Sequence, residues 1–210
     1  MQLHYIDGSP FARMARILIR EHGLDVALHE ITVFPPPEEF LALNPMGQVP
    51  VLVADGQAWF PTRIILDVVL AGAAPGGPVA SAVSRPGSAR ADEQLLAVIL
   101  AMADALVAHH YALWAGIGPV TTNRLGFDPA DRAMIRTLAT LDWLEARIGT
   151  GAFQPGTVSV QDIALACVIL WTESREPIAW RGRPGIEAMV EALSARPSVL
   201  ATRPRPHQLK

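Results

Sequence analysis

The chain of 210 residues is 50% hydrophobic and 18% charged, so it can form a substantial core in one large domain or two small ones. Its net charge of -3, without any block of Lys or Arg, argues against nucleic acid as a partner. Cys167 is the single cysteine, which excludes intramolecular disulfides, Cys-x-x-Cys redox chemistry and thiolate metal sites.

Neither a secretory signal nor a membrane-spanning segment is expected. The first residues, Met1–His4, lack a basic stretch followed by an apolar one. The apolar runs are too short to cross a bilayer: Ile163–Trp171 is the best of them, and Asp104 interrupts the run Leu95–Val107. We therefore expect a protein of the reducing cytoplasm that has no membrane partner.

The N-terminal third of the chain predicts a thioredoxin-like α/β domain. Leu3–Ile6 is strand-like, and apolar residues then recur at helical spacing between Pro10, which suits a first helical turn, and Gly23, which suits a helix end. Further along, the pattern predicts a strand at Val26–Val33, a short helix at Glu38–Leu43, a hairpin of Val49–Val53 with Gln57–Phe60, and a helix through Ile64–Val69. Two parallel strands joined by a helix and followed by a hairpin give the βαβ-ββα order of that domain.

The rest of the chain predicts an all-helical domain. Ala71–Ala89 is rich in Gly, Pro, Ser and Ala, which is typical of a linker. No strand pattern follows it, and helices are predicted at Ala91–Trp114, Pro129–Ile148, Ser159–Glu173 and Pro184–Ala195. Ser159 and Asp162 have the spacing of a capping box. We therefore expect a thioredoxin-like domain at 1–73, a linker at 74–89 and a helical bundle at 90–210.

Three parts of the sequence resemble one family. They are Gly8–Arg13, Asn44–Leu52 and, in the helical half, the segments Leu141–Glu145, Ser159–Leu165 and Arg196–Pro204. In this order they resemble the serine-type soluble glutathione transferases of bacteria, over nearly the whole chain. The resemblance implies a glutathione-binding first domain and a helical domain that binds an apolar electrophile. It also implies glutathione as co-substrate, no metal, and a cytoplasmic homodimer with a role in detoxification.

Ser9 is the candidate catalytic residue. As the resemblance implies, these enzymes activate the thiol of glutathione, which at a pKa of about 8.5 is only a few per cent thiolate at neutral pH. Lowering that pKa by about two units requires about 2.7 kcal/mol of preferential thiolate stabilisation. A hydroxyl bonded to the sulfur supplies roughly 1.5–3 kcal/mol, and a helix N-terminus adds about 0.3–2 kcal/mol. Ser9, at the start of a predicted helix, is placed for both effects.

Two alternatives stay open around this turn. Ser9 is also a good helix N-cap, a role that requires no catalysis. Tyr5 is a rival hydroxyl, because some branches of the family use a tyrosine near the end of this strand. The alternative for Tyr5 is a half-buried aromatic of the strand.

Gln48, Val49 and Pro50 are candidates to bind glutathione, together with Phe11 in the active-site turn. The resemblance implies a cis Val49–Pro50 bond, which would turn the N–H and C=O of Val49 outward to pair with the peptide backbone of glutathione. An ordinary trans proline is the alternative. Gln48 either holds a carboxylate of the ligand or is simply solvated.

The chain departs from the family pattern at Phe60-Pro61-Thr62-Arg63. As the resemblance implies, relatives usually have an acid and then a serine at the start of this helix. The acid holds the ammonium group of glutathione, and the serine and helix N–H groups hold its γ-glutamyl carboxylate. Thr62 can replace the serine, but Pro61 offers no side-chain acceptor. Losing a charge-assisted bond costs roughly 1.5–3 kcal/mol. Asp104 is either a compensating charge across a dimer interface or a solvated helix residue.

Several functions therefore stay open. The leading expectation is a glutathione transferase, with Trp114 either lining the electrophile pocket or buried. The alternative, motivated by Pro61, is a degenerate member of the family that binds ligands or partners without efficient glutathione use. A third reading keeps glutathione but changes the reaction to an isomerisation or a dehalogenation, because a fold does not fix a chemistry.

Overall fold

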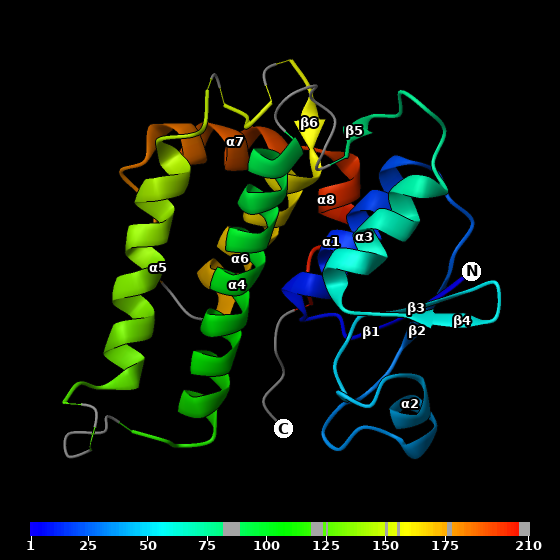
Figure 1. Ribbon diagram of the computed structural model, residues 1–210, viewed down its shortest axis with the longest axis horizontal. Coiled ribbons are helices and arrows are strands. Elements are labelled where there is room, and N and C mark those ends of the chain that lie inside the picture. Colours follow the sequence, from blue (N-terminus) through cyan, green and yellow to red (C-terminus); the bar gives the residue numbers. More distant parts are fainter. Residues whose placement is uncertain are drawn as a thin grey trace.

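The structure is a computed structural model that describes residues 1–81, 89–118, 124, 126–149, 151–154, 156–175 and 178–205. Two halves lie side by side, a small mixed sheet with three helices and a bundle of longer helices (Figure 1). The elements are β1 (Gln2–Tyr5), α1 (Pro10–Glu21), β2 (Ala27–Glu30), α2 (Glu38–Leu43), β3 (Val51–Ala54), β4 (Gln57–Trp59), α3 (Thr62–Ala71), β5 (Val79–Ala80), α4 (Ala89–Trp114), α5 (Pro129–Glu145), β6 (Val158–Ser159), α6 (Val160–Arg175), α7 (Pro184–Ser194) and α8 (Pro197–Ala201).

The first half has the predicted thioredoxin-like order. Its four-stranded sheet runs β2-β1-β3-β4, in which β1 pairs parallel with β2 and antiparallel with β3, and β3 and β4 form the hairpin. Helices α1 and α3 pack together on one face, and α2 lies beyond the other face (Figure 1). Gly23 adopts a left-handed φ of 60° just after α1, as the helix-stop reading requires. The predicted α/β order of the first half is therefore confirmed.

The reading that no strand follows the first domain is wrong. Val79–Ala80 pairs parallel with Val158–Ser159, so a two-residue bridge joins the chain after α3 to the start of α6. A strand of two residues is too short to show the alternation that predicts strands. Residues 82–88 of the predicted linker lie outside the described residues, and the domain boundaries at 73 and 89 stay a prediction.

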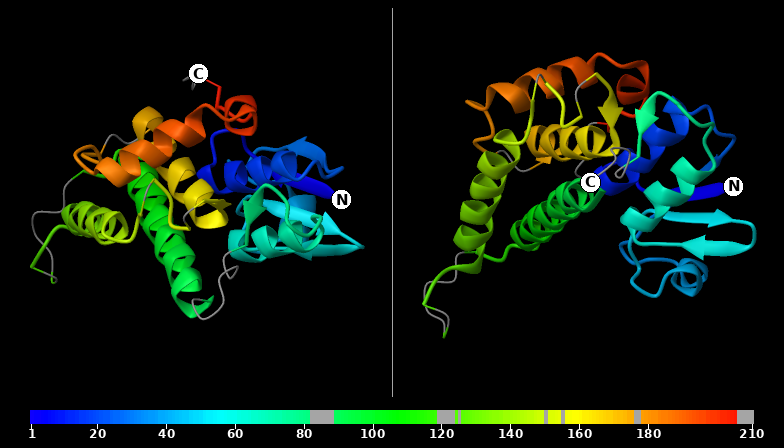
Figure 2. Two further views of the ribbon diagram at one scale, coloured as in Figure 1. Left: turned by 90° about the horizontal axis from the view of Figure 1, so that it is seen from above. Right: turned by 45° about the horizontal axis from the view of Figure 1, so that its top comes forward.

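Four of the helices in the second half match the predicted ones to within three residues at each end, and α8 was not predicted. Helix α6 is central: it packs against α4, α7 and α1, and nearly every side chain from Val160 to Thr172 is buried. Helix α8 has only five residues, too few for a periodic pattern. Figure 2 shows α4, α5 and α6 as a bundle beside the sheet half. The all-helical second half is confirmed apart from the short β5–β6 pair.

The start of α6 is fixed by the predicted capping box. The backbone N–H of Asp162 donates to Ser159 Oγ at 3.2 Å, and Asp162 Oδ2 accepts from the backbone N–H of Ser159 at 2.7 Å. Asp162 Oδ1 also accepts from the N–H of Phe153 at 2.9 Å, and its side chain is 1% exposed. A buried carboxylate with three donors therefore holds the preceding loop against the central helix.

Helix α4 is longer and more apolar than the sequence reading allowed. Among the described residues it is the one helix with the length and composition to cross a membrane, with a mean hydropathy of 1.6 over its best 18-residue window. Length and composition alone do not assign α4 to a membrane, because a helix in the core of a soluble protein can have the same length and composition. Its buried residues, including Leu96, Ile99 and Leu106, belong to the main hydrophobic cluster, and it packs against α5 and α6.

Helix α1 is fastened to the helical half at its C-terminal end. Glu21 Oε1 accepts a hydrogen bond from Arg196 Nε at 2.9 Å and another from the hydroxyl of Ser198 at the start of α8. Because Arg196 and Glu21 also form an ion pair, the carboxylate is charged and well satisfied. The helix that begins at Ser9 thus ends on a contact with the opposite half.

Candidate active site

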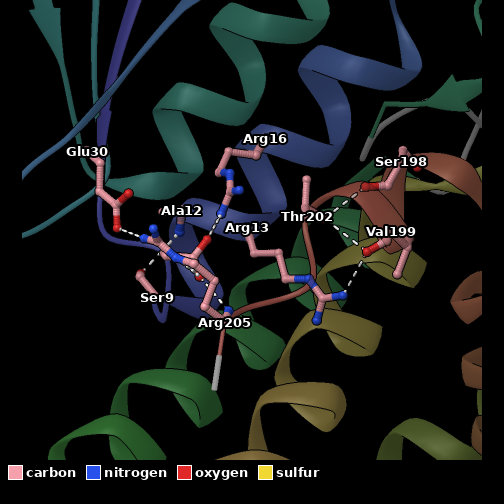
Figure 3. A network of polar contacts seen from close by, with 10 residues as sticks. Ser9, Ala12, Arg13, Arg16, Glu30, Ser198, Val199, Thr202 and Arg205 are labelled. Atoms are coloured by element: carbon pink, nitrogen blue, oxygen red, sulfur yellow. Dashed lines mark hydrogen bonds and ion pairs between the residues drawn. The ribbon is translucent and has the colours of Figure 1, made fainter. Parts of the chain in front are cut away.

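Ser9 lies between β1 and α1 and caps the helix. Its backbone is extended (φ -80°, ψ 122°), its N–H donates to the carbonyl of Ile6 at 3.1 Å, and its Oγ accepts from the N–H of Ala12 at 3.2 Å (Figure 3). Pro10 occupies the first helical turn, where a missing N–H costs nothing. The structure therefore bears out the N-cap reading. A hydroxyl has one donor and two lone pairs, and this cap uses a lone pair, so the O–H of Ser9 is left as a donor.

Tyr5, the rival hydroxyl, is the last residue of β1 and is half-buried. The guanidinium of Arg16 lies over its ring, 4.5 Å from the centroid, and Arg16 also donates to Asp7 at 3.0 Å. This stacking gives the ring a structural role, as the strand-aromatic reading of Tyr5 has it.

The segment before β3 holds a free peptide group. The Val49–Pro50 bond is cis, and Asn44, which is 1% exposed, donates to the carbonyl of Gln48 at 2.8 Å and so braces the loop. Within the described part of the chain, the N–H and C=O of Val49 take part in no hydrogen bond. Val49 therefore presents one donor and one acceptor to a peptide ligand.

The start of α3 offers an anion site without an acid. Thr62 is 8% exposed at the first helical position, and the N–H groups there have no partner within the helix. Pro61 is the exposed N-cap, and its carbonyl accepts from the N–H of Ile64 at 2.9 Å. The nearby acids Asp67 and Glu93 are both ion-paired with Arg63. These two acids are therefore engaged by Arg63 and do not stand in for the one that Pro61 lacks.

The sheet register brings these segments to one edge. His4 pairs with Val51 and Leu52 pairs with Trp59, so the C-terminal ends of β1 and β4 lie beside the N-terminal end of β3. Ser9 follows β1, Val49 precedes β3 and Thr62 follows β4, and all three therefore lie along the same edge. Gln48 is exposed in the loop beside Val49.

Two other predicted site residues, Phe11 and Asp104, lie on helices α1 and α4. Phe11, on the first turn of α1, is half-buried and packs against the hydrophobic core, which gives it a packing role beside any contact with a ligand. Asp104 is an exposed residue of α4, and packing around its carboxyl raises the pKa above the ordinary value. Its predicted role across a dimer interface stays a prediction.

An aromatic cluster joins the two halves next to this edge. Phe34, in the loop after β2, meets Tyr111 and Trp114 of α4 edge-on, with ring centroids 5.5 and 5.8 Å apart. Tyr111 and Trp114 stack at 6.2 Å, and His110 stands edge-on to Trp171 of α6 at 5.4 Å. Phe34 and Trp114 are 59% and 52% exposed, so the cluster presents an open apolar wall.

The sequence reading missed most of this wall. It left Trp114 undecided between lining a pocket and being buried, and the 52% exposure of its side chain excludes burial. Phe34 and Tyr111 were not singled out, although Tyr111 and Trp114 are three apart and so share a helix face. Phe34 lies in a loop, where no periodicity points to a partner.

Arg175, the last residue of α6, was also missed. A Cβ placed on Gly8 would lie only 3.1 Å from its Nη2, so the guanidinium rests against the turn that presents Ser9. Burial raises the pKa of the Tyr111 phenol above its ordinary value, and the charge of Arg175 opposes that rise. Arg175 therefore acts on both the turn and the aromatic wall.

Cys167 is buried and is not a candidate nucleophile. Cys167 is 1% exposed in the middle of α6, and burial raises the pKa of its thiol to about 12, so it is not a nucleophile at neutral pH. The part of the chain that the structure describes holds no group of three metal-ligating side chains.

The chain is similar to glutathione transferases in sequence and in structure. Residues 3–77 match the family model of the glutathione S-transferase N-terminal domain. A glutathione transferase family member from Pseudomonas fluorescens Pf-5, solved with bound glutathione, is 30% identical, with a TM-score of 0.77 over 97% of this chain and 98% of that one. The same family member with bound S-(propanoic acid)-glutathione is 29% identical with a TM-score of 0.78, covering 98% and 100% of the two chains.

A further relative is similar to this chain along nearly its whole length. The uncharacterized GST-like protein YibF of Escherichia coli K12 is 28% identical over 204 residues, which is 93% of this chain and 95% of that protein. The likeness therefore extends through both halves of the chain, beyond the N-terminal domain model.

Proposed function

Because the chain belongs to the glutathione S-transferase family, we propose that it binds glutathione and activates its thiol through Ser9 for transfer to an apolar electrophile. The observation that carries this proposal is the placement of Ser9. Its hydroxyl caps α1 with a lone pair and keeps its O–H to donate to a sulfur anion. The cap also brings the sulfur to the positive end of a 12-residue helix.

These two effects are large enough for the chemistry. A hydrogen bond to a charged sulfur contributes roughly 1.5–3 kcal/mol, and a helix N-terminus about 0.3–2 kcal/mol. Together they cover the roughly 2.7 kcal/mol that a two-unit fall in thiol pKa requires. Ala12, which donates to the Ser9 oxygen, further polarises the hydroxyl, because linked hydrogen bonds strengthen one another.

In this proposal the tripeptide lies along the sheet edge. The free N–H and C=O of Val49 pair with its backbone, and Thr62 with the first N–H groups of α3 holds the γ-glutamyl carboxylate. Gln48, exposed beside Val49, is placed to bind the other carboxylate. The Pseudomonas fluorescens relatives with bound glutathione and with a bound glutathione conjugate support this use of the fold.

The electrophile in this proposal lies on the aromatic wall. Phe34, Tyr111 and Trp114 offer exposed ring faces and edges, which suit an apolar or aromatic molecule. The phenol of Tyr111 stays protonated at neutral pH and can donate to a polar atom of that molecule.

A second function rests on Pro61. Without an acid at the start of α3, the ammonium group of glutathione lacks its ion-pair partner, and affinity falls by about tenfold to over a hundredfold. A chain with so weak a site would act as a ligand carrier on the same fold. Its ligands would use the same aromatic wall.

Calorimetric titration with glutathione near neutral pH separates the two functions. The transferase proposal expects binding in the micromolar to low millimolar range. No heat at millimolar glutathione would mean that Pro61 disables the site, and the carrier function would then lead. A screen of apolar electrophiles with product analysis follows the first outcome, and also separates conjugation from isomerisation or dehalogenation.

Assembly and place in the cell complete the proposal. We propose a cytoplasmic homodimer that takes part in detoxification, with the partner subunit's Asp104 as the compensating charge for Pro61. Light scattering of the purified protein measures the oligomeric state. An Asp104→Asn variant with unchanged glutathione affinity would remove that residue from the site, and cell fractionation tests the location.

A further inference from the structure

A pocket adjoins the turn that carries Ser9. It has a volume of about 600 Å³ and lies between the N-terminal turn of α1, the C-terminal end of α6 and the segment that follows α8. Four arginines from these three places line it: Arg13, Arg175, Arg203 and Arg205. Figure 3 shows Arg13 and Arg205 reaching this region from opposite ends of the chain. The pocket is therefore strongly cationic.

Arg13 is the buried base of the pocket. Its side chain is 4% exposed, its Nη2 donates to the carbonyl of Val199 at 3.0 Å, and its buried Nε has no hydrogen-bond partner. Burial lowers the pKa of this guanidinium from its ordinary value. A buried cation without an ion-pair partner is costly, and a site that places one beside a cavity is suited to an anion.

The acids of the region are already engaged elsewhere. Glu173 is the one carboxylate among the described residues of the lining, and it pairs with Arg181 at 3.0 Å. Arg205 is held by Asp7 and Glu30. Within the described part of the chain, Arg13, Arg175 and Arg203 form no ion pair. Three guanidinium groups, from α1, from α6 and from the segment after α8, therefore line one cavity, and none of them has an ion-pair partner among the described residues.

We propose that this pocket binds a small organic anion, with its phosphate or carboxylate group held by Arg13, Arg175 and Arg203. Planar guanidinium groups recognise both kinds of group through paired hydrogen bonds. The volume exceeds what a bare phosphate fills, and Leu170 and Val199 line the remaining wall. The ligand therefore has an apolar body attached to its anionic group.

This site is separate from the proposed glutathione site. No residue between 44 and 62, the stretch that holds Val49 and Thr62, lines the pocket. The two ligands are expected to bind at the same time, on either side of the Gly8–Ser9 turn. Arg175 also rests against the Gly8 backbone, so it is shared with the turn that presents Ser9, whereas Arg13 and Arg203 belong to the anion site alone.

Calorimetric titration with phenyl phosphate and, separately, with benzoate tests the site. We expect at least one to bind the wild-type chain, and the tighter of the two identifies the preferred group. Arg203→Gln, on the exposed rim, and Arg13→Met, at the base, should each weaken binding by about tenfold or more, the loss of one charged hydrogen bond. Arg20→Gln, an exposed arginine on the far end of α1, is the matched control and should bind as the wild type does.

Three results would overturn the proposal. They are the absence of binding by both probes at millimolar concentration, an equal loss in Arg20→Gln, and competition between either probe and saturating glutathione. The folding of Arg13→Met is checked by its thermal unfolding curve. Arg203→Gln carries the test if that variant does not fold.

Discussion

The guanidinium of Arg175 rests against the backbone of Gly8, so closely that a methyl group on Gly8 would lie 3.1 Å from its Nη2. Arg175 ends the central helix of the bundle, whereas Gly8 belongs to the turn that presents Ser9. A cation from the helical half thus rests against the turn that carries the hydroxyl proposed to activate the thiol. Its charge favours an anion at that place.

Removing that charge should therefore disfavour the thiolate. We expect Arg175→Gln to raise the apparent pKa of the bound glutathione thiol by up to about one unit, because a nearby cation stabilises the charged form. The ultraviolet absorbance of the thiolate, followed against pH, measures this change. Arg136→Gln, at an exposed position of α5, serves as the control. An unchanged thiol pKa in Arg175→Gln would show that the charge does not reach the sulfur.

The Ser9 hydroxyl can be separated from its capping role. Ser9→Ala should destabilise the chain by about 1 kcal/mol through loss of the cap. It should also lower kcat/KM by about tenfold to over a hundredfold through loss of the bond to sulfur. Ser9→Asp keeps an acceptor for the Ala12 N–H but has no hydroxyl, so it should restore stability without activity. Ser9→Thr should retain both.

Steady-state kinetics and thermal unfolding of these three variants provide the measurement. Full turnover by Ser9→Ala would leave Ser9 as a cap only. Turnover by Ser9→Asp would have the same meaning, because a carboxylate repels a thiolate.

We expect position 61 to set the affinity for glutathione in the proposed site. Pro61→Glu supplies the missing acid at the exposed start of α3 and should tighten glutathione binding by about tenfold to a hundredfold, the strength of a charged hydrogen bond. Pro61→Gln has nearly the same shape without the charge and should gain little. Calorimetry on the two variants makes the comparison. Equal affinities for wild type and Pro61→Glu would mean that another group already holds the ammonium.

The aromatic wall should decide electrophile binding without affecting glutathione. Phe34→Ala removes a ring that contacts Tyr111 and Trp114, and aromatic pairs contribute about 0.5–1.5 kcal/mol beyond their buried area. We expect the KM for an aromatic electrophile to rise about two- to tenfold, with the affinity for glutathione unchanged. Ile135→Ala, which removes an exposed apolar side chain of α5, is the control. A change in glutathione affinity alone would place Phe34 in the other half of the site.

Acid stability should depend on Glu21. Its hydrogen bond from Arg196 holds the pKa of the carboxyl below its ordinary value, against the opposing effect of burial. A lowered pKa stabilises the fold above the unfolded-state value of about 4.3, and this contribution is lost as the pH falls through the lower folded-state value. Wild type should therefore lose stability below about pH 5, whereas Glu21→Gln should be less stable at neutral pH and lose less on acidification.

Thermal unfolding between about pH 7 and pH 3 tests this expectation. Glu191→Gln on the exposed face of α7 is the control and should follow the wild type. Parallel curves for wild type and Glu21→Gln would contradict the role given to the Arg196 contact.

Local patterns in the sequence predict much of the fold. The βαβ-ββα order, the stop at Gly23 and the capping box of Ser159 and Asp162 each depend on residues close together in the chain. The position of Ser9 at a helix start is of the same kind. Such features depend on the conformational preferences and hydrogen bonds of neighbouring residues, and these can be read from a single sequence.

What could not be predicted depends on contacts between distant residues. Phe34 meets Trp114 across the two halves, and Gly8 meets Arg175, which is far along the chain. The β5–β6 pair and α8 are too short to leave a periodic signal. No spacing rule links such positions, so only the folded chain shows that they share a site.

Helix α1 connects the position of Ser9 to a contact at the opposite end of the helix. One end carries the Ser9 hydroxyl, and the other is held by Arg196 and Ser198 through Glu21. A substitution near α8 can therefore tilt α1 and displace the Ser9 hydroxyl while every residue around Ser9 is unchanged. Loss of activity in such a variant would show that α1 transmits a displacement from one of its ends to the other, an effect that the residues around Ser9 do not reveal by themselves.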